Sequence, residues 1–158
     1  MSVTFREATR SDLPRLVQML ADDALGATRE RFEDPLPEPY LAAFAAIAAD
    51  PNQELLVAER DGLVVGTLQL TFIPSITRLG SWRSQIEGVR VATEARGDGL
   101  GRELMEEALR RSRDRGVQLV QLTTDKQRPE ALRFYQGLGF TPTHEGLKLT
   151  LHPSDPDI

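Results

Sequence analysis

A glycine-rich segment in the second half of the chain holds the residues best suited to bind an anion. It runs Arg96-Gly-Asp-Gly-Leu-Gly101 and leads directly into an amphipathic pattern. Glycines at Gly97, Gly99 and Gly101 let the backbone turn tightly and leave no side chain between its N–H groups and a ligand. A helix that starts here adds its own unpaired N–H groups and the positive end of its dipole. The segment therefore predicts a cradle for a phosphate or diphosphate.

The flanking residues place this segment between a strand and a helix. Residues 85–91 predict a strand, and the pattern after the glycines predicts a helix that ends at Gly116. The buried stripe of that helix is expected to be Leu100, Leu104, Met105, Ala108 and Leu109. No Gly-Lys-Ser/Thr follows the glycines, so the loop is not a P-loop. Taken alone, the segment is also compatible with a tight turn that binds nothing.

The rest of the chain predicts a mixed sheet with helices. Strands are expected at 3–8, 54–59, 63–73, 85–91, 117–123 and 145–151, and helices after the N-cap Ser11 and at 40–49, 100–115 and 129–138. Asp61-Gly62 is a strong hairpin signal between two of the strands. The order β-α-α-β-β-β-α-β-α-β indicates an α/β (α+β) fold with an antiparallel first half and a parallel crossover. We expect one domain over residues 1–152 and a tail over 153–158.

Composition limits the class of protein. The chain has 158 residues, a net charge of -5, no cysteine and two histidines. These values argue against nucleic acid as a partner, a thiolate site, a catalytic thiol and a histidine-rich metal centre. No apolar run approaches the roughly 20 residues that span a bilayer, and the first residues do not resemble a secretory signal. We expect a cytoplasmic protein without a metal or a membrane partner.

Two motifs together resemble the GNAT superfamily of acetyl-CoA-dependent N-acetyltransferases. The family's motif Gln/Arg-x-x-Gly-x-Gly/Ala is matched at every specified position by the segment that begins at Arg96. Its second signature, Asn-x-x-Ala-x-x-Phe-Tyr-x-x-x-Gly-Phe, is matched from Arg128 to Phe140, where Arg128 replaces the asparagine. The resemblance covers nearly the whole chain and is weakest before residue 50.

The resemblance implies a fold in which the fourth and fifth strands splay apart and acetyl-CoA lies in the opening. Val89 would polarise the thioester carbonyl, and Tyr135 would protonate the departing thiolate. Arg133 is a candidate contact for the 3′-phosphate. The expected coenzyme-binding residues are Val89, Val91, Arg96, Gly97, Asp98, Gly99, Leu100, Gly101, Arg102, Arg128 and Arg133.

The acceptor amine must lose a proton, because a free alkylamine with a pKa near about 10 is almost wholly cationic at neutral pH. Glu87 is the candidate base, since strand alternation places it on the same face as Val89 and Val91. An ordinary solvated strand residue is the alternative interpretation of Glu87. The acceptor pocket is expected near the acidic residues of 30–34 and the loop 74–83.

The predicted function is acetyl transfer from acetyl-CoA to a primary amine by direct attack. A small amine, an amino acid, an aminoglycoside-like antibiotic and a peptide N-terminus all remain open as acceptors. Two other functions also remain open: a non-catalytic acyl-CoA sensor and a structural subunit with an unused cleft. Dimers are common in the family, so a homodimer is an expectation from the resemblance alone.

Overall fold

The computed structural model describes residues 2–152, and the tail expected at 153–158 lies outside them. Residues up to Gln121 form one compact unit, and residues from Leu122 onward form a second. The expectation of one domain over residues 1–152 stays a prediction.

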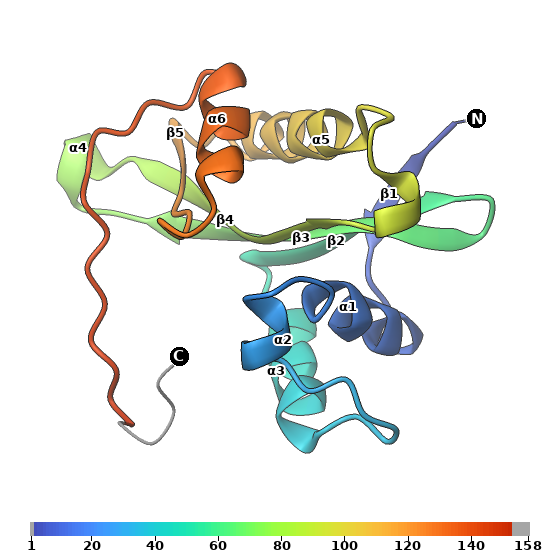
Figure 1. The fold of residues 1–158 in the computed structure, drawn as a ribbon. Coiled ribbons are helices and arrows are strands. Elements are labelled where there is room, and N and C mark those ends of the chain that lie inside the picture. Colours follow the sequence, from blue (N-terminus) through green and yellow to red (C-terminus); the bar gives the residue numbers. More distant parts are fainter. Residues whose placement is uncertain (1, 153–158) are drawn as a thin grey trace. The chain divides into compact units, whose positions relative to one another are not determined.

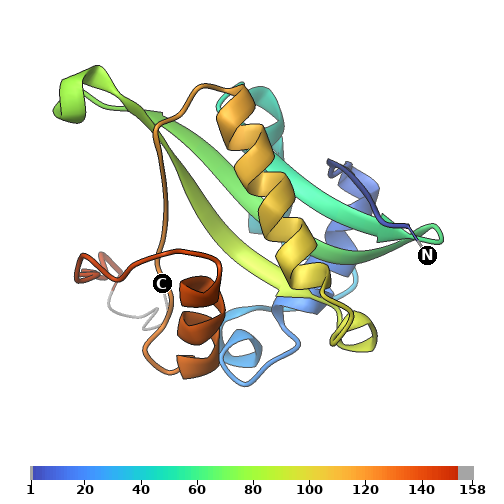
Figure 2. The ribbon, with the colours of Figure 1, turned by 90° about the horizontal axis from the view of Figure 1, so that it is seen from above.

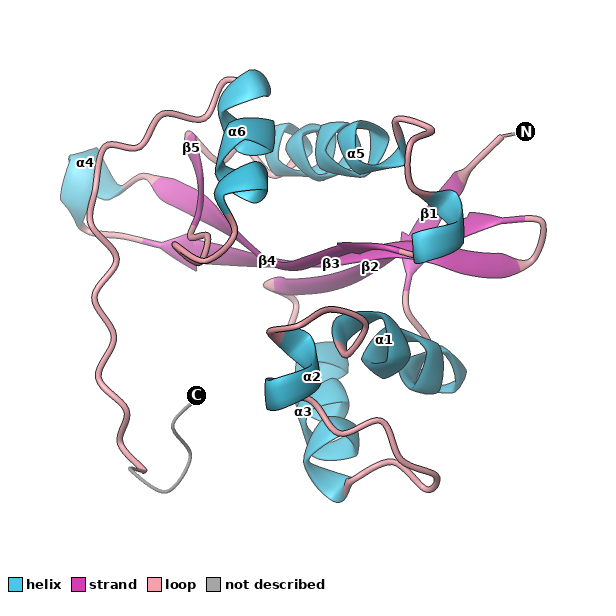
Figure 3. Ribbon diagram, viewed as in Figure 1, coloured by secondary structure: helices cyan, strands magenta, loops and turns pink. Residues whose placement is uncertain are grey.

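A five-stranded sheet in the order β1-β2-β3-β4-β5 is the centre of the fold (Figure 1, Figure 3). Its strands are β1 (Thr4–Glu7), β2 (Gln53–Arg60), β3 (Leu63–Pro74), β4 (Trp82–Val91) and β5 (Leu119–Leu122). The first four pair antiparallel. Asp61 and Gly62 have φ of 52° and 76° between β2 and β3, which confirms the hairpin.

The pairing of β4 with β5 makes the sheet mixed. The backbone N–H of Gln118 donates to the carbonyl of Trp82 at 3.0 Å, and the Gln121 amide donates to the side chain of Gln85 at 2.7 Å. From the first contact to the second, the residue number rises by three in both strands, so the strands run parallel. Both contacts lie in the first half of β4. The predicted class, a mixed sheet with a parallel crossover, is confirmed.

Helices cover both faces of the sheet in the first unit. One face carries α1 (Leu13–Leu20), α2 (Gly26–Arg29) and α3 (Glu38–Ala49), and the other carries α5 (Leu100–Asp114), which runs across β3 and β4 (Figure 1, Figure 2). Short helical turns occur at η1 (Arg10–Asp12), α4 (Thr77–Gly80) and η2 (Thr93–Ala95). The second unit contains α6 (Pro129–Gly137).

The start of the first helix differs from the prediction. Thr9, and not Ser11, is the N-cap of the opening turn η1, and the Asp12 carboxylate accepts the backbone N–H of Thr9 at 2.7 Å, as in a capping box. Arg6 donates to the same carboxylate at 2.7 Å and holds the pKa of Asp12 below its usual value. The sequence shows four polar residues in a row here, and local preference alone does not tell which of them is the N-cap.

The last predicted strand is absent from the described residues. Residues 145–151 form no strand, and Leu147, Leu149 and Leu151 are 91%, 85% and 81% exposed. Their alternation is that of a strand with one apolar face. A strand also needs a neighbouring backbone to pair with, and alternation alone does not provide one.

The buried stripe of α5 agrees with the prediction except at its end. Leu100, Leu104, Met105 and Ala108 are buried, whereas Leu109 is half-buried and Ser112 continues the stripe. Ser112 is 1% exposed and Ser84 of β4 is fully buried. Ser84 donates to the Ser112 hydroxyl, which donates to the Ala108 carbonyl, each at 2.8 Å.

We expect Ser112→Ala to destabilise the fold by about 1–3 kcal/mol, because the buried Ser84 hydroxyl loses its acceptor. Ser84→Ala should cost less, since Ser112 keeps its bond to Ala108. The double variant should be more stable than Ser112→Ala alone, because it leaves no buried hydroxyl unpaired. Urea unfolding of the three variants measures this. A double variant at least as unstable as Ser112→Ala would contradict it.

Candidate active site

The glycine loop has the backbone geometry that the sequence predicts. It follows η2 and leads into α5, with φ of 90° at Gly97 and 77° at Gly99. The Gly99 carbonyl accepts the first helical hydrogen bond from the N–H of Glu103 at 3.1 Å. A Cβ atom at Gly97 or Gly99 would meet no atom within 4 Å. The positive φ requires glycine, and the space beside the backbone is open to a ligand.

The loop is exposed but held at several points. Ala95 before it and Leu100 after it are each 1% exposed, while residues 96–99 between them are exposed. The Arg96 guanidinium donates to the Val91 carbonyl at 3.3 Å. Asp98 accepts a hydrogen bond from Arg60 of β2 at 3.0 Å. Of the predicted coenzyme residues, Val91 and 96–102 are thus gathered at one end of α5.

A β-bulge lies in β4, close to this loop in sequence. The register with β3 shifts there, so one residue of β3, Leu68, faces two residues of β4, Gly88 and Val89. Gly88 has φ of 63°, which favours glycine. A bulge bends its strand and disrupts the ladder of hydrogen bonds. The bulge includes Val89, whose N–H is predicted to donate to the thioester carbonyl.

The bulge changes which residues share a face. Strict alternation predicts Glu87, Val89 and Val91 on one face. In the structure Glu87 lies opposite Gln69 and Val91 lies opposite Gly66. Because these β3 partners are an odd number of residues apart, Glu87 and Val91 lie on opposite faces. That part of the prediction is wrong.

Glu87 instead shares its face with Arg90, on the side of the sheet that α1 covers. Arg90 lies 4.0 Å from the carboxylate of Asp23, and a Cβ atom at Gly88 would lie 3.9 Å from Leu20 of α1. The Glu87 side chain is exposed and makes no hydrogen bond or ion pair within residues 2–152. The Glu87 carboxylate is therefore accessible to solvent.

The remaining predicted residues lie in the second unit. Arg128 precedes α6, and its carbonyl accepts the N–H of Ala131 at 3.1 Å. Arg133 is exposed. The half-buried Tyr135 ring packs edge-on against Phe134 and Phe140, with ring centroids 5.3 and 6.1 Å away. The approach of these residues to the glycine loop stays a prediction.

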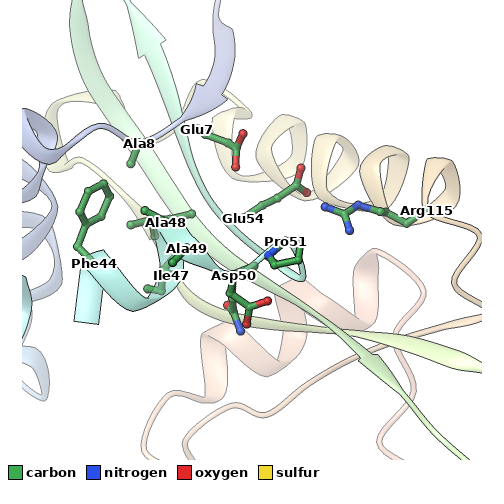
Figure 4. A pocket seen from close by; sticks show the side chains of 12 residues that line it. Glu7, Ala8, Phe44, Ile47, Ala48, Ala49, Asp50, Pro51, Glu54 and Arg115 are labelled. Atoms are coloured by element: carbon green, nitrogen blue, oxygen red, sulfur yellow. The ribbon is translucent and has the colours of Figure 1, made fainter. Parts of the chain in front are cut away.

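A cavity of about 590 Å³ lies away from the glycine loop, at the other end of α5. Figure 4 shows apolar side chains of α3 on one side and the carboxylates of Glu7 and Glu54 toward Arg115 on the other. Arg115 follows α5, whose 15 residues separate it from the loop by about 22 Å. None of the predicted site residues lines this cavity.

The comparison with known proteins identifies the family. The model of the acetyltransferase (GNAT) family matches residues 17–140, which include the glycine loop, the bulge and the Tyr135 motif. The chain belongs to the GNAT family of acetyltransferases. Members of the GNAT family use acetyl-CoA and act on amine acceptors.

Two curated GNAT relatives carry specific names. An aminoalkylphosphonate N-acetyltransferase of Salmonella typhimurium is 33% identical over 101 residues, 64% of this chain and 65% of that protein. A glucosamine 6-phosphate N-acetyltransferase of Trypanosoma brucei brucei is 34% identical over 90 residues, 57% of this chain and 59% of that protein. This chain therefore spans less than two thirds of the length of either relative.

Solved structures of similar proteins share the fold. A transcriptional regulator from Bacillus halodurans C-125 is 55% identical, with a TM-score of 0.92 over 95% of this chain and 100% of that chain. An acetyltransferase of Trypanosoma brucei is 28% identical, with a TM-score of 0.74 over 95% of this chain and 100% of that chain.

Residues 2–152 show neither a metal-binding cluster nor a membrane-spanning helix. No three His, Cys, Asp or Glu side chains there are grouped so that they could hold a metal ion. None of the helices described is long and apolar enough to cross a bilayer.

Two residues that shape this region, Gly88 and Arg60, were not identified from the sequence. Gly88 could have been recognised, since an isolated glycine inside a strand pattern signals a bulge. Arg60 could not, because 38 residues separate it from Asp98 and nothing local marks the pair.

We expect Gly99→Val to weaken acetyl-CoA binding strongly, because a branched side chain would enter the open space beside the loop. Gly116→Val is its matched control: Gly116 has φ of 75°, and a Cβ atom there also meets nothing within 4 Å. Both variants should lose a similar 1–3 kcal/mol or so of stability from backbone strain. Calorimetric titration should show at least tenfold weaker binding for Gly99→Val only. Equal binding by the two variants would contradict the cradle.

Proposed function

We propose that this protein catalyses transfer of the acetyl group from acetyl-CoA to a primary amine, by direct attack of the amine. The observation that carries the proposal is the glycine loop: positive φ at Gly97 and Gly99, with open space beside both, at the start of α5. A diphosphate fits this cradle, since neither glycine places a side chain there and the first turn of α5 presents unpaired N–H groups. Acetyl-CoA supplies an activated acyl group as a thioester.

The residues of β4 would orient the acyl group. The bulge at Gly88 and Val89 interrupts pairing with β3, and a bulged strand leaves backbone groups outside its ladder. In this proposal the Val89 N–H donates to the acyl carbonyl oxygen and stabilises the negative charge that develops there. Val91 would contribute backbone hydrogen bonds in the manner of an added strand.

Two side chains would move protons. Glu87 accepts a proton from the incoming ammonium, directly or through water, and its exposure leaves it free to do so. Tyr135 donates its phenolic proton to the leaving thiolate. A phenol is acidic enough to protonate such a basic leaving group.

For the acceptor we propose a small primary amine that also carries an anionic group. Two curated relatives are named for an aminoalkylphosphonate and for glucosamine 6-phosphate, both amines with phosphorus-bearing groups. Here Glu87 and Arg90 share a face of β4, so a carboxylate for the amine and a guanidinium for the anion lie three residues apart.

A thiol-release assay with acetyl-CoA tests the proposal across a panel of aminoalkylphosphonates, amino sugar phosphates, amino acids, aminoglycosides and peptides. The expected result is turnover, fastest with anionic small amines. If the protein binds acetyl-CoA but turns over no acceptor, the alternative function of a non-catalytic acyl-CoA sensor is favoured. If acetyl-CoA does not raise the melting temperature, the structural-subunit alternative is favoured.

We expect Tyr135→Phe to lower kcat by about 100-fold while the Kd for acetyl-CoA stays within a few fold, because only the acid is removed. Phe134→Leu is the control, since it disturbs the same ring contact and keeps the phenol. That variant should change stability more than kcat. Unchanged turnover in Tyr135→Phe would reject the acid role.

A further inference from the structure

The acidic residue inside the glycine loop is at odds with an anion-binding function. Asp98 lies between Gly97 and Gly99, and its carboxylate is 55% exposed. A negative charge at the mouth of a diphosphate cradle repels the ligand over the distances at which loop and ligand meet. The chain must compensate this charge for the cradle to work.

Arg60 is the group that faces this carboxylate. It ends β2, next to the hairpin turn, and its guanidinium donates to Asp98 at 3.0 Å. The contact joins the hairpin to a loop that follows it by 38 residues. It is therefore a tertiary link between the sheet and the loop.

The burial of Arg60 distinguishes this pair from an ordinary surface ion pair. Its side chain is only 18% exposed, and its Nε is buried without a hydrogen-bond partner within residues 2–152. Exposed pairs hold their side chains weakly. A mostly buried guanidinium that donates to Asp98 is held in place on one side, so it fixes the loop more firmly than an exposed side chain would.

We propose that Arg60 is a positioning residue of the coenzyme site: it cancels the charge of Asp98 and holds the glycine loop in the geometry that receives the diphosphate. This inference rests on the proposed function. Arg60 acts through Asp98 and does not itself touch the coenzyme.

Four variants separate this role from a purely structural one. Arg60→Gln leaves the Asp98 charge uncompensated, and we expect the Kd for acetyl-CoA to rise about tenfold with little change in kcat at saturation. Asp98→Asn keeps an oxygen that accepts from Arg60 and removes the charge, so binding should be as tight as in the wild type or tighter. The double variant should recover part of the lost binding, because it removes the uncompensated charge but does not restore the link that holds the loop. Arg60→Lys keeps the charge and should lose less than Arg60→Gln.

The ratio of Kd between Arg60→Gln and the wild type should shrink as salt rises from low to about 0.5 M, because salt screens exposed charges. Arg113→Gln is the matched control, since it removes an exposed arginine near the other end of α5. It should not change the Kd.

Calorimetric titration with CoA and with acetyl-CoA measures the Kd of each variant, and melting temperatures show whether each variant folds. If the double variant binds as weakly as Arg60→Gln, or if Arg60→Gln binds like the wild type, the inference is overturned. If Arg60→Gln does not fold, Arg60→Lys and Asp98→Asn carry the test: coenzyme binding weakened by Asp98→Asn overturns it. Wild-type protein that does not bind acetyl-CoA would refute the proposed function instead.

Discussion

The packing of one face of α5 against β3 and β4 is the constraint that places the glycine loop. Leu104 and Met105 are fully buried, and a Cβ atom at Gly66 of β3 would lie 3.5 Å from Leu104. A Cβ atom there would be in van der Waals contact with the helix, so α5 packs directly on the sheet at this point. Because this buried face fixes α5 on β3 and β4, the N-terminus of the helix and the glycine loop before it are positioned by the same contacts.

The bulge in β4 is the second determinant, because it places chemically different residues on the two faces of one strand. Glu87 and Arg90 lie on the side of α1, whereas Val91 lies on the side of α5. A regular strand would have placed Glu87 and Val91 together. The charged groups proposed for the acceptor are therefore separated from the apolar face against which the main helix packs.

Features that depend on residues close in sequence could be predicted from the sequence. Features that depend on contacts between residues far apart in sequence could not. The glycine loop, the Asp61-Gly62 hairpin and the stripe of α5 follow from local backbone preference and periodicity. The prediction of which β4 residues after Gly88 share a face was wrong, because strand alternation assumes an unbroken ladder of hydrogen bonds. The link from Arg60 to Asp98 has no local signature, and the last strand was predicted from a pattern that carries no information about its partner.

The three exposed leucines of residues 145–151 have a thermodynamic consequence. Burying each leucine in a sheet would gain about 1.5–3 kcal/mol, or roughly 5–9 kcal/mol for all three. Fixing the backbone of those seven residues costs about 1–2 kcal/mol each, which is of the same size or larger. Apolar burial alone therefore cannot order the segment. A strand at these residues would also need the hydrogen bonds of a neighbouring backbone.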